Sequence, residues 1–220
     1  MEFKLKTQIP FPMGLQQETA QLAQEVVGRY SDFFAWVQLG EKPAISVQEI
    51  DTYYALSLAQ KKEEDEVYNK NEETVKEKWL LSQWDIEYFY GLTRPADVGC
   101  ACPFNWMEKV ERVVDQQYPI FGVERFPELY DKAAHMAWLI IKNQVFPDYN
   151  IGIAVLAVFV LLGRNELVIS ASEEDLKSFV TLTRLWIQKS ELEPEHEDAA
   201  IKELGNIIKT WGRLLQKIKE

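Results

Sequence analysis

An uninterrupted apolar run near the middle of the chain constrains the fold more than any other feature. Residues 151–162, IGIAVLAVFVLL, contain no charged or strongly polar side chain. A helix that is apolar on every side has to be covered on every side by other elements. The run is shorter than the about 17–25 residues that a membrane span needs. It therefore predicts a core helix around which the rest of the chain packs.

A second buried helix is predicted directly before this run, over residues 129–142, because apolar side chains recur there at helical spacing. The polar joint between the two helices spans Asn143 to Asn150 and contains Pro147. Two buried helices hold a short loop rigidly, and the N-terminus of a helix favours negative groups. We therefore expect the functional site of the protein at this joint.

The remaining patterns are mostly helical, so the predicted fold class is all-α. Apolar stripes at helical spacing cover residues 15–37, 46–58, 79–89, 106–114, 172–186 and 194–218. Residues 118–126 have the glycine, proline and aromatic content of a short hairpin. We expect an N-terminal helical extension, residues 1–103, packed on a helical core, residues 104–220, or a single compact domain.

Sequence signals also predict several helix ends. Capping pairs mark starts at Ser46, Asn105 and Ser172, and prolines mark starts at Pro127 and Pro194. Two glycines mark stops, Gly40 after the first helix and Gly163 after the apolar run.

Charge and cysteine content exclude several classes of function. The chain has 24 basic and 35 acidic residues, a net charge of −11, which repels nucleic acids and anionic membranes. Its two cysteines, Cys100 and Cys102, cannot build a disulfide framework, and we expect free thiols rather than a zinc site. The N-terminal residues lack the apolar segment of a signal peptide. These features favour a cytoplasmic protein.

The joint carries a recognisable motif. The segment FGVERFPELYDKAAHMAWLIIKN (121–143) precedes QVFPDYNIG (144–152). Phe146, Asp148 and Asn150 have the spacing of a signature that reads His, any residue, Phe, any residue, acidic, small, Asn, Lys or Gly, Arg. Together with the helix that follows, these segments resemble the Fic/Doc family, in particular its death-on-curing branch, over about residues 106–186.

The resemblance implies a bacterial, toxin–antitoxin-like protein with a helical core and a flap hairpin. Family members transfer part of a nucleoside triphosphate to a protein hydroxyl. On this chain the resemblance places Gln144 at the catalytic position, Asp148 as the Mg²⁺ ligand, Asn150 and Tyr149 at the phosphate site, and Phe146 as a structural residue. The flap, where a protein partner would dock by strand addition, comprises Phe121, Gly122, Val123, Glu124, Arg125 and Phe126.

This chain departs from the signature at the residues that perform chemistry. Gln144 replaces the His, and a carboxamide cannot act as a general base, a role worth about 10²–10⁴-fold in rate. Ile151 and Gly152 replace the two cations, and charge-assisted contacts to phosphate are worth about 1.5–3 kcal/mol each. His135 lies about 13 Å before Gln144 along the predicted helix, too far to substitute.

These departures favour a catalytically degenerate protein that acts through protein–protein contacts and needs no cofactor. On that hypothesis Asp148 stabilises the start of a helix, while Gln144 and Asn150 satisfy backbone groups of the loop. The alternative hypothesis is a transferase with altered chemistry, in which Asp148 holds Mg²⁺, Gln144 positions the nucleoside triphosphate, and the acceptor is a protein hydroxyl. The sequence leaves the oligomeric state open.

Overall fold

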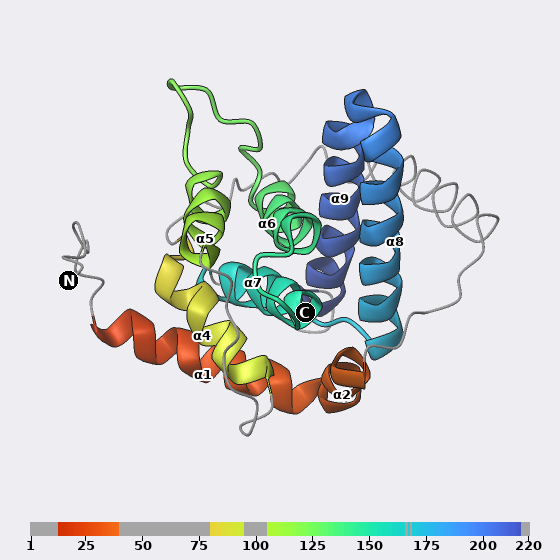
Figure 1. The fold of residues 1–220 in the computed structure, drawn as a ribbon. Helices are drawn as coiled ribbons and strands as arrows, with labels where there is room; N and C mark the ends of the chain where they lie inside the picture. The colour runs from red at the N-terminus through yellow and green to blue at the C-terminus, as the bar shows by residue number, and fades with distance from the viewer. Residues whose placement is uncertain (1–12, 40–79, 95–104, 166, 168, 217–220) are drawn as a thin grey trace.

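The computed structural model describes residues 13–39, 80–94, 105–165, 167 and 169–216, with only the backbone described at 13–15 and 212–216. In these residues the protein is all-α and no strand forms, which confirms the predicted fold class (Figure 1). The helices are α1 (Met13–Arg29), α2 (Ser31–Leu39), α4 (Gln83–Thr93), α5 (Trp106–Asp115), α6 (Leu129–Asn143), α7 (Asn150–Arg164), α8 (Glu173–Leu192), the 3₁₀ helix η1 (Pro194–His196) and α9 (Glu197–Gln216). None of the described helices is long and apolar enough to cross a membrane.

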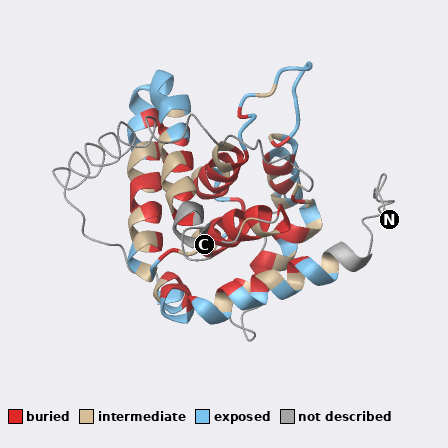
Figure 2. Cartoon of the chain, turned by 180° about the vertical axis from the view of Figure 1, so that it is seen from behind, coloured by how far each residue is buried: buried red, intermediate tan, exposed pale blue. Residues whose placement is uncertain are grey.

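Helix α7 contains the apolar run and forms the centre of the molecule. It is buried along almost its whole length, with only Ile151 and Gly163 partly accessible (Figure 2). Helices α1, α2, α4 and α6 contact it, and α6 in turn contacts α5, α8 and α9. The prediction that other elements must cover this helix is confirmed.

A buried ion pair joins the end of α7 to the start of α4. The Arg164 guanidinium donates to Asp85 Oδ2 at 2.9 Å, and both side chains are almost completely buried. The same carboxylate oxygen accepts the backbone N–H of Ser82 at 2.6 Å and closes a capping box at the N-terminus of α4. One carboxylate therefore orders a helix start and neutralises a buried cation.

Helices α6 and α9 approach each other closely at Gly205. A Cβ added at Gly205 would lie 2.2 Å from Asp131 Oδ1 and 3.0 Å from the Asp131 Cα. The missing side chain lets the backbones of α6 and α9 come together, so this glycine sets their separation.

The segment between α5 and α6, residues 116–128, extends from the helical body as an exposed arm (Figure 1). Ile120 and Val123 form a single antiparallel bridge, with backbone hydrogen bonds of 3.0 Å in both directions. Phe121 and Gly122 between them both have positive φ, 51° and 79°, as in a type I′ turn. The predicted flap hairpin is therefore wrong in its strands: only a tight turn with one bridge is present.

The base of this arm is anchored on two sides. On one side the buried Lys132 Nζ donates to the Gln117 carbonyl at 2.6 Å and pairs with Glu124. On the other side Arg125 donates to Glu197 at 3.0 Å and pairs with Asp198. Ion pairs to α6 and α9 thus hold the arm in place.

Most predicted helix starts agree with the structure to within a few residues. Ser172 closes a capping box with Asp175, as predicted. Asn105 is the N-cap of α5, but its side chain makes no capping hydrogen bond. Helix α6 begins at Leu129 rather than Pro127, and Pro194 opens a 3₁₀ turn before α9.

Two other predictions differ from the structure in detail, and three more lie outside the described residues. The single helix expected over 15–37 breaks at Tyr30 into α1 and α2, and α7 ends at Arg164, one residue after the predicted stop at Gly163. The helix predicted at 46–58, the stop at Gly40 and both cysteines lie outside the described residues.

A methyl group at Gly205 should destabilise the protein. Because Cα and N of Asp131 lie only 3.0 and 3.1 Å from the point that this methyl carbon would occupy, Gly205→Ala forces α6 and α9 apart, and we expect a loss of about 1–3 kcal/mol. Gly28→Ala is the matched control, because it lies in α1 with open space around it and should stabilise by about 0.4–1 kcal/mol. Urea unfolding measures both; equal stabilities would contradict the close approach.

His135 in the middle of α6 makes the stability depend on pH. Its ring is buried and packs on Phe126 with centroids 4.6 Å apart. Burial lowers the pKa of His135 from 6.5 to about 4; Arg125 and Lys142 also lower it, while Glu197 and Asp198 oppose them. The folded protein therefore binds the proton less readily than the unfolded chain.

Because the pKa of His135 is lowered in the folded protein, we expect the stability of the fold to decrease as the pH falls. Above pH 6.5 the histidine is neutral in both the folded and the unfolded protein, and its burial costs no stability. As the pH falls from 6.5 toward 4, only the unfolded chain binds the proton, and the free energy of unfolding falls. The free energy of unfolding should drop by about 2 kcal/mol between pH 7 and pH 5. His135→Phe should remove this drop, whereas His196→Gln, at an exposed position, should retain it. Urea titrations at the two pH values test it, and a drop that persists in His135→Phe would exclude His135 as its source.

Candidate functional site

The joint between α6 and α7, residues 144–149, forms the motif loop. Gln144 ends α6 in the left-handed conformation, with φ 45°, and its Nε2 donates to the Ile141 carbonyl at 2.7 Å. Lys109 of α5 donates to the carbonyls of Asn143 and Gln144 at 3.1 and 2.9 Å. The Gln144 amide and the Lys109 ammonium therefore satisfy the carbonyl groups at the end of α6.

Asn150 closes the motif loop on itself. Its Oδ1 accepts the Phe146 N–H at 3.0 Å, and its Nδ2 donates to the Phe146 carbonyl at 2.8 Å and to the Asp148 carbonyl at 3.4 Å. The side chain is buried. All three hydrogen bonds go to the backbone of the loop, so this amide holds the loop in shape.

Phe146 anchors the middle of the motif loop in the core. Its ring is buried and stacks on Tyr90 of α4, with centroids 4.2 Å apart and planes at 11°. Trp106 of α5 also packs on this cluster, 5.6 Å from the Phe146 centroid. The aromatic cluster fixes the loop against α4 and α5.

Asp148 lies beside the hydroxyl of Tyr90. Burial raises the pKa of Tyr90, the Asp148 carboxylate raises it further, and Arg94 lowers it. The second oxygen of Asp148, Oδ1, is buried and has no hydrogen-bond partner among the described residues. This oxygen is thus a polar atom of the loop that the described residues leave unsatisfied.

The residues around Asp148 do not by themselves complete a magnesium site. Among the described residues no group of three His, Cys, Asp or Glu side chains could hold a metal ion. Mg²⁺ is usually held by one or two carboxylates together with substrate phosphates. Only one carboxylate is present in the motif loop, and it also interacts with Tyr90. The described residues therefore offer a single carboxylate, which would hold Mg²⁺ only together with phosphate oxygens of a substrate.

A cavity of about 250 Å³ opens beside the motif loop. Helix α8 contributes the side chain of Arg184, and burial lowers the pKa of this guanidinium. Tyr149, in the left-handed conformation with φ 56°, is the N-cap of α7 and makes no capping hydrogen bond with its side chain. The lining residues are Trp36, Val37, Gln38, Ile141, Gln144, Asp148, Tyr149, Asn150, Ile151 and Arg184.

The two positions where the family signature has cations carry no charge here. Ile151 lines the cavity with an apolar side chain. Gly152 lies in the core, where an added Cβ would lie 3.1 Å from Thr93 Cγ2 and 3.3 Å from the Phe34 ring. A side chain as long as Arg does not fit at Gly152 without moving α2 or α4.

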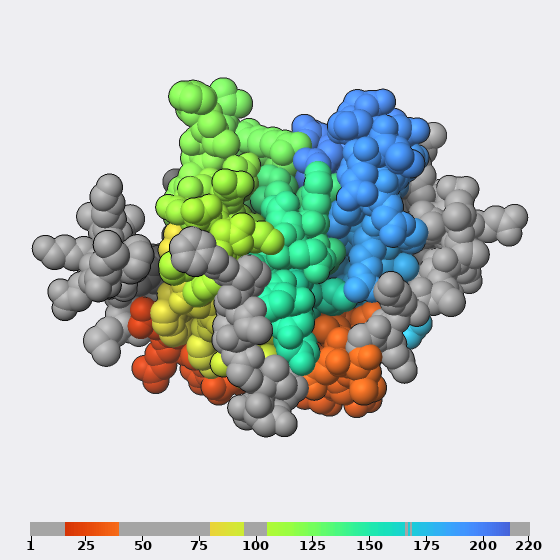
Figure 3. All heavy atoms as spheres, viewed as in Figure 1, coloured from red at the N-terminus to blue at the C-terminus, as the bar shows by residue number. Residues whose placement is uncertain are grey.

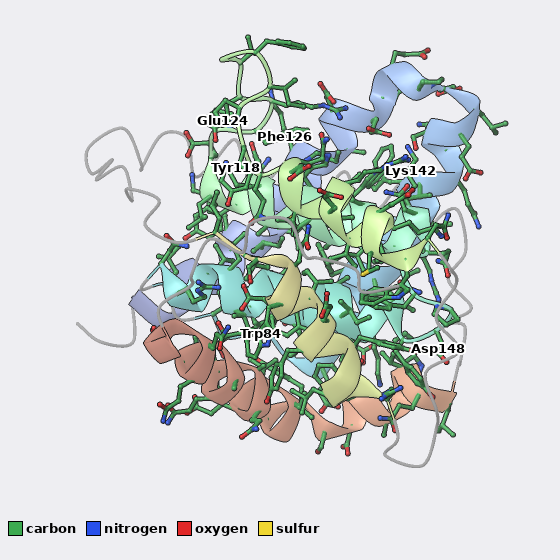
Figure 4. The ribbon with its side chains drawn as sticks, turned by 60° about the vertical axis from the view of Figure 1, so that its left-hand side comes forward. Trp84, Tyr118, Glu124, Phe126, Lys142 and Asp148 are labelled. Atoms are coloured by element: carbon green, nitrogen blue, oxygen red, sulfur yellow. The ribbon has the colours of Figure 1, made fainter. Side chains whose placement is uncertain are left out.

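The predicted flap and the motif loop lie at opposite ends of α6. This helix has 15 residues, so the two features are separated by about 22 Å along its axis. Figure 4 shows Asp148 far from Tyr118, Glu124 and Phe126 of the arm. The structure thus brings the residues of the motif loop together and leaves the flap residues apart from them.

A comparison with protein-family models, with curated proteins and with solved structures found no match. The family resemblance therefore depends on the residues of the sequence motif alone.

Sequence reasoning missed three contributors to this site. Lys109, Tyr90 and Arg184 come from α5, α4 and α8, far from the motif in the chain. No spacing pattern connects them with the loop, because they meet it only through the packing of the helices. The sequence does not single out Arg184 either, because Lys177 is a second basic residue in the same helical pattern.

Removing the Asn150 amide should destabilise the motif loop. Asn150→Ala leaves the buried N–H and C=O of Phe146 without partners, and we expect a loss of about 2–4 kcal/mol. Asn143→Ala, at the exposed end of α6, is the control and should change stability by less than about 0.5 kcal/mol. Chemical denaturation measures the difference; equal effects of the two substitutions would show that the Asn150 bonds do not support the fold.

Proposed function

We propose that this protein is a non-catalytic relative of the Fic/Doc fold that acts by binding another protein. The observation that carries the proposal is the internal use of the motif residues. Asn150 bonds to the backbone of its own loop, Gln144 bonds to the end of α6, and Gly152 is packed in the core. These residues support the fold of the loop.

The motif loop also lacks the groups that a transferase needs. The Gln144 amide has no basic pKa near neutrality and cannot take a proton from a hydroxyl. The cavity of about 250 Å³ is smaller than the about 300–1,000 Å³ of typical ligand pockets. A nucleoside triphosphate would need both more space and more positive charge than Arg184 supplies.

The binding surface in this proposal is the arm between α5 and α6. It carries exposed apolar side chains, and ion pairs to α6 and α9 hold its base. The arm lies about 22 Å from the motif loop along α6, so the contact proposed at the arm does not need the loop residues. On this proposal the surface that binds the partner is distinct from the loop that resembles the catalytic motif.

The alternative, a Mg²⁺-dependent transferase with altered chemistry, is favoured by two specific observations. Asp148 Oδ1 is buried without a hydrogen-bond partner among the described residues, and the Arg184 guanidinium lines the same cavity. A bound metal and phosphate would satisfy both groups. In that case Gln144 would position the substrate, and Asp148 would hold the metal.

Nucleotide titrations distinguish the two functions. We expect no rise in melting temperature with ATP, GTP, CTP or UTP, with or without Mg²⁺, and no transfer of label from these nucleotides to protein. Gln144→His restores a base but no phosphate-binding cation, so we expect it to remain inactive as well. A Mg²⁺-dependent thermal shift that disappears in Asp148→Ala would overturn the non-catalytic proposal and support the alternative.

A further inference from the structure

The tip of the arm exposes an unusual concentration of apolar side chains. Phe121 is fully exposed, at 102% of its reference area, and Val123 is 72% exposed. We define the arm tip by Tyr118, Ile120, Phe121 and Val123, which make up four of the seven large apolar residues that are exposed in the described part of the chain. Aromatic side chains presented in this way are typical of residues that dominate the energy of protein interfaces.

The backbone of the arm tip forms a closed turn. Its turn is closed by two hydrogen bonds between Ile120 and Val123, and Phe121 has a positive φ at the outer end of the turn. Below the turn, Phe126 is buried against His135. Binding through a preformed knob loses less conformational entropy than binding through a mobile loop.

An acidic corner lies next to the arm. Residues 190–198, SELEPEHED, run from the end of α8 through η1 to the start of α9 and contain five carboxylates and no Lys or Arg. Glu197 and Asp198 of this corner bind Arg125 of the arm, so the two surfaces adjoin. Glu197 also pairs with Lys142, and the other three carboxylates of this corner, those of Glu191, Glu193 and Glu195, are exposed. Figure 3 shows both at the same end of the molecule. Leu192 in the corner is 85% exposed and adds a further apolar side chain to this end of the molecule.

We propose that the arm tip inserts Phe121 into an apolar pocket on a partner protein whose surrounding surface carries Lys and Arg. This inference rests on the proposed function and specifies its partner. Charge complementarity selects the partner, because the acidic corner and the net charge of −11 attract a basic surface. A second copy of the chain does not fit, since a twofold contact at this surface would bring two acidic corners together.

Side-chain insertion fits this arm better than strand addition. A partner strand needs a row of free backbone groups along an extended edge. The arm pairs only Ile120 with Val123, and no strand forms among its described residues. The apolar knob is therefore the feature that the arm offers to a partner.

A photo-cross-linking amino acid at position 121 tests this contact in cells that express the full chain. The control places the same amino acid at Leu39, which is 76% exposed on α2, away from the arm. We expect a cross-linked protein from position 121 that is absent from position 39. The same cross-link from both positions, or none from position 121, would overturn the inference.

Affinity measurements with the cross-linked protein, identified by mass spectrometry and purified, complete the test. Phe121→Ala should raise the Kd by about 30-fold or more, as at interface hot spots, and Leu39→Ala should leave it unchanged. Phe121→Asn is a second variant that also removes the ring. Because Asn tolerates a positive φ, the turn should keep its conformation in this variant. The Kd should also rise with salt and in Glu193→Lys. Equal affinity of wild type and both Phe121 variants would overturn the contact, and a Kd insensitive to salt and to Glu193→Lys would overturn the basic partner.

These outcomes are separate from those of the proposed function. Nucleotide binding that depends on Asp148 would overturn the non-catalytic proposal whatever the result at Phe121. Binding of a partner that does not involve Phe121 would overturn only the contact proposed for the arm.

Discussion

The burial of α7 is the constraint on which the rest of the described structure depends. A helix that is apolar on every face cannot be left exposed, so α1, α2, α4 and α6 have to cover it. Its cationic end, Arg164, is acceptable in the interior only because Asp85 neutralises it. Since that carboxylate also caps α4, a single side chain links the end of α7 to the start of α4.

The motif loop shows how a signature can serve the fold when its chemistry is absent. Phe146 fills an aromatic cluster, and Asn150 satisfies the backbone of the loop. The role of Asn150 favours a carboxamide at this spacing, because this group can both accept from a buried N–H and donate to a buried C=O four residues earlier. Gly152 fits its position for a different reason, as close packing against Thr93 and Phe34 leaves no space for a longer side chain.

The arm and the cavity have opposite physical characters, and α6 keeps them apart. The cavity is small, partly polar and lined by Asp148 and by the partly buried guanidinium of Arg184. The arm tip is apolar, exposed and adjacent to a run of carboxylates. Such a division suits a protein in which recognition of a partner is independent of the loop that resembles a catalytic motif.

The sequence by itself determined the helical character of the chain, the central position of 151–162 and the loop between two buried helices, because local periodicity and apolar content govern these features. It could also indicate the capping box at Ser172, since three-residue spacing is a local signal. Only the tertiary structure decided that α1 and α2 separate at Tyr30, that the expected hairpin is a single turn, and that Lys109, Tyr90 and Arg184 meet the motif loop. The reason is that these outcomes depend on contacts between residues far apart in the chain, which no spacing within one segment encodes.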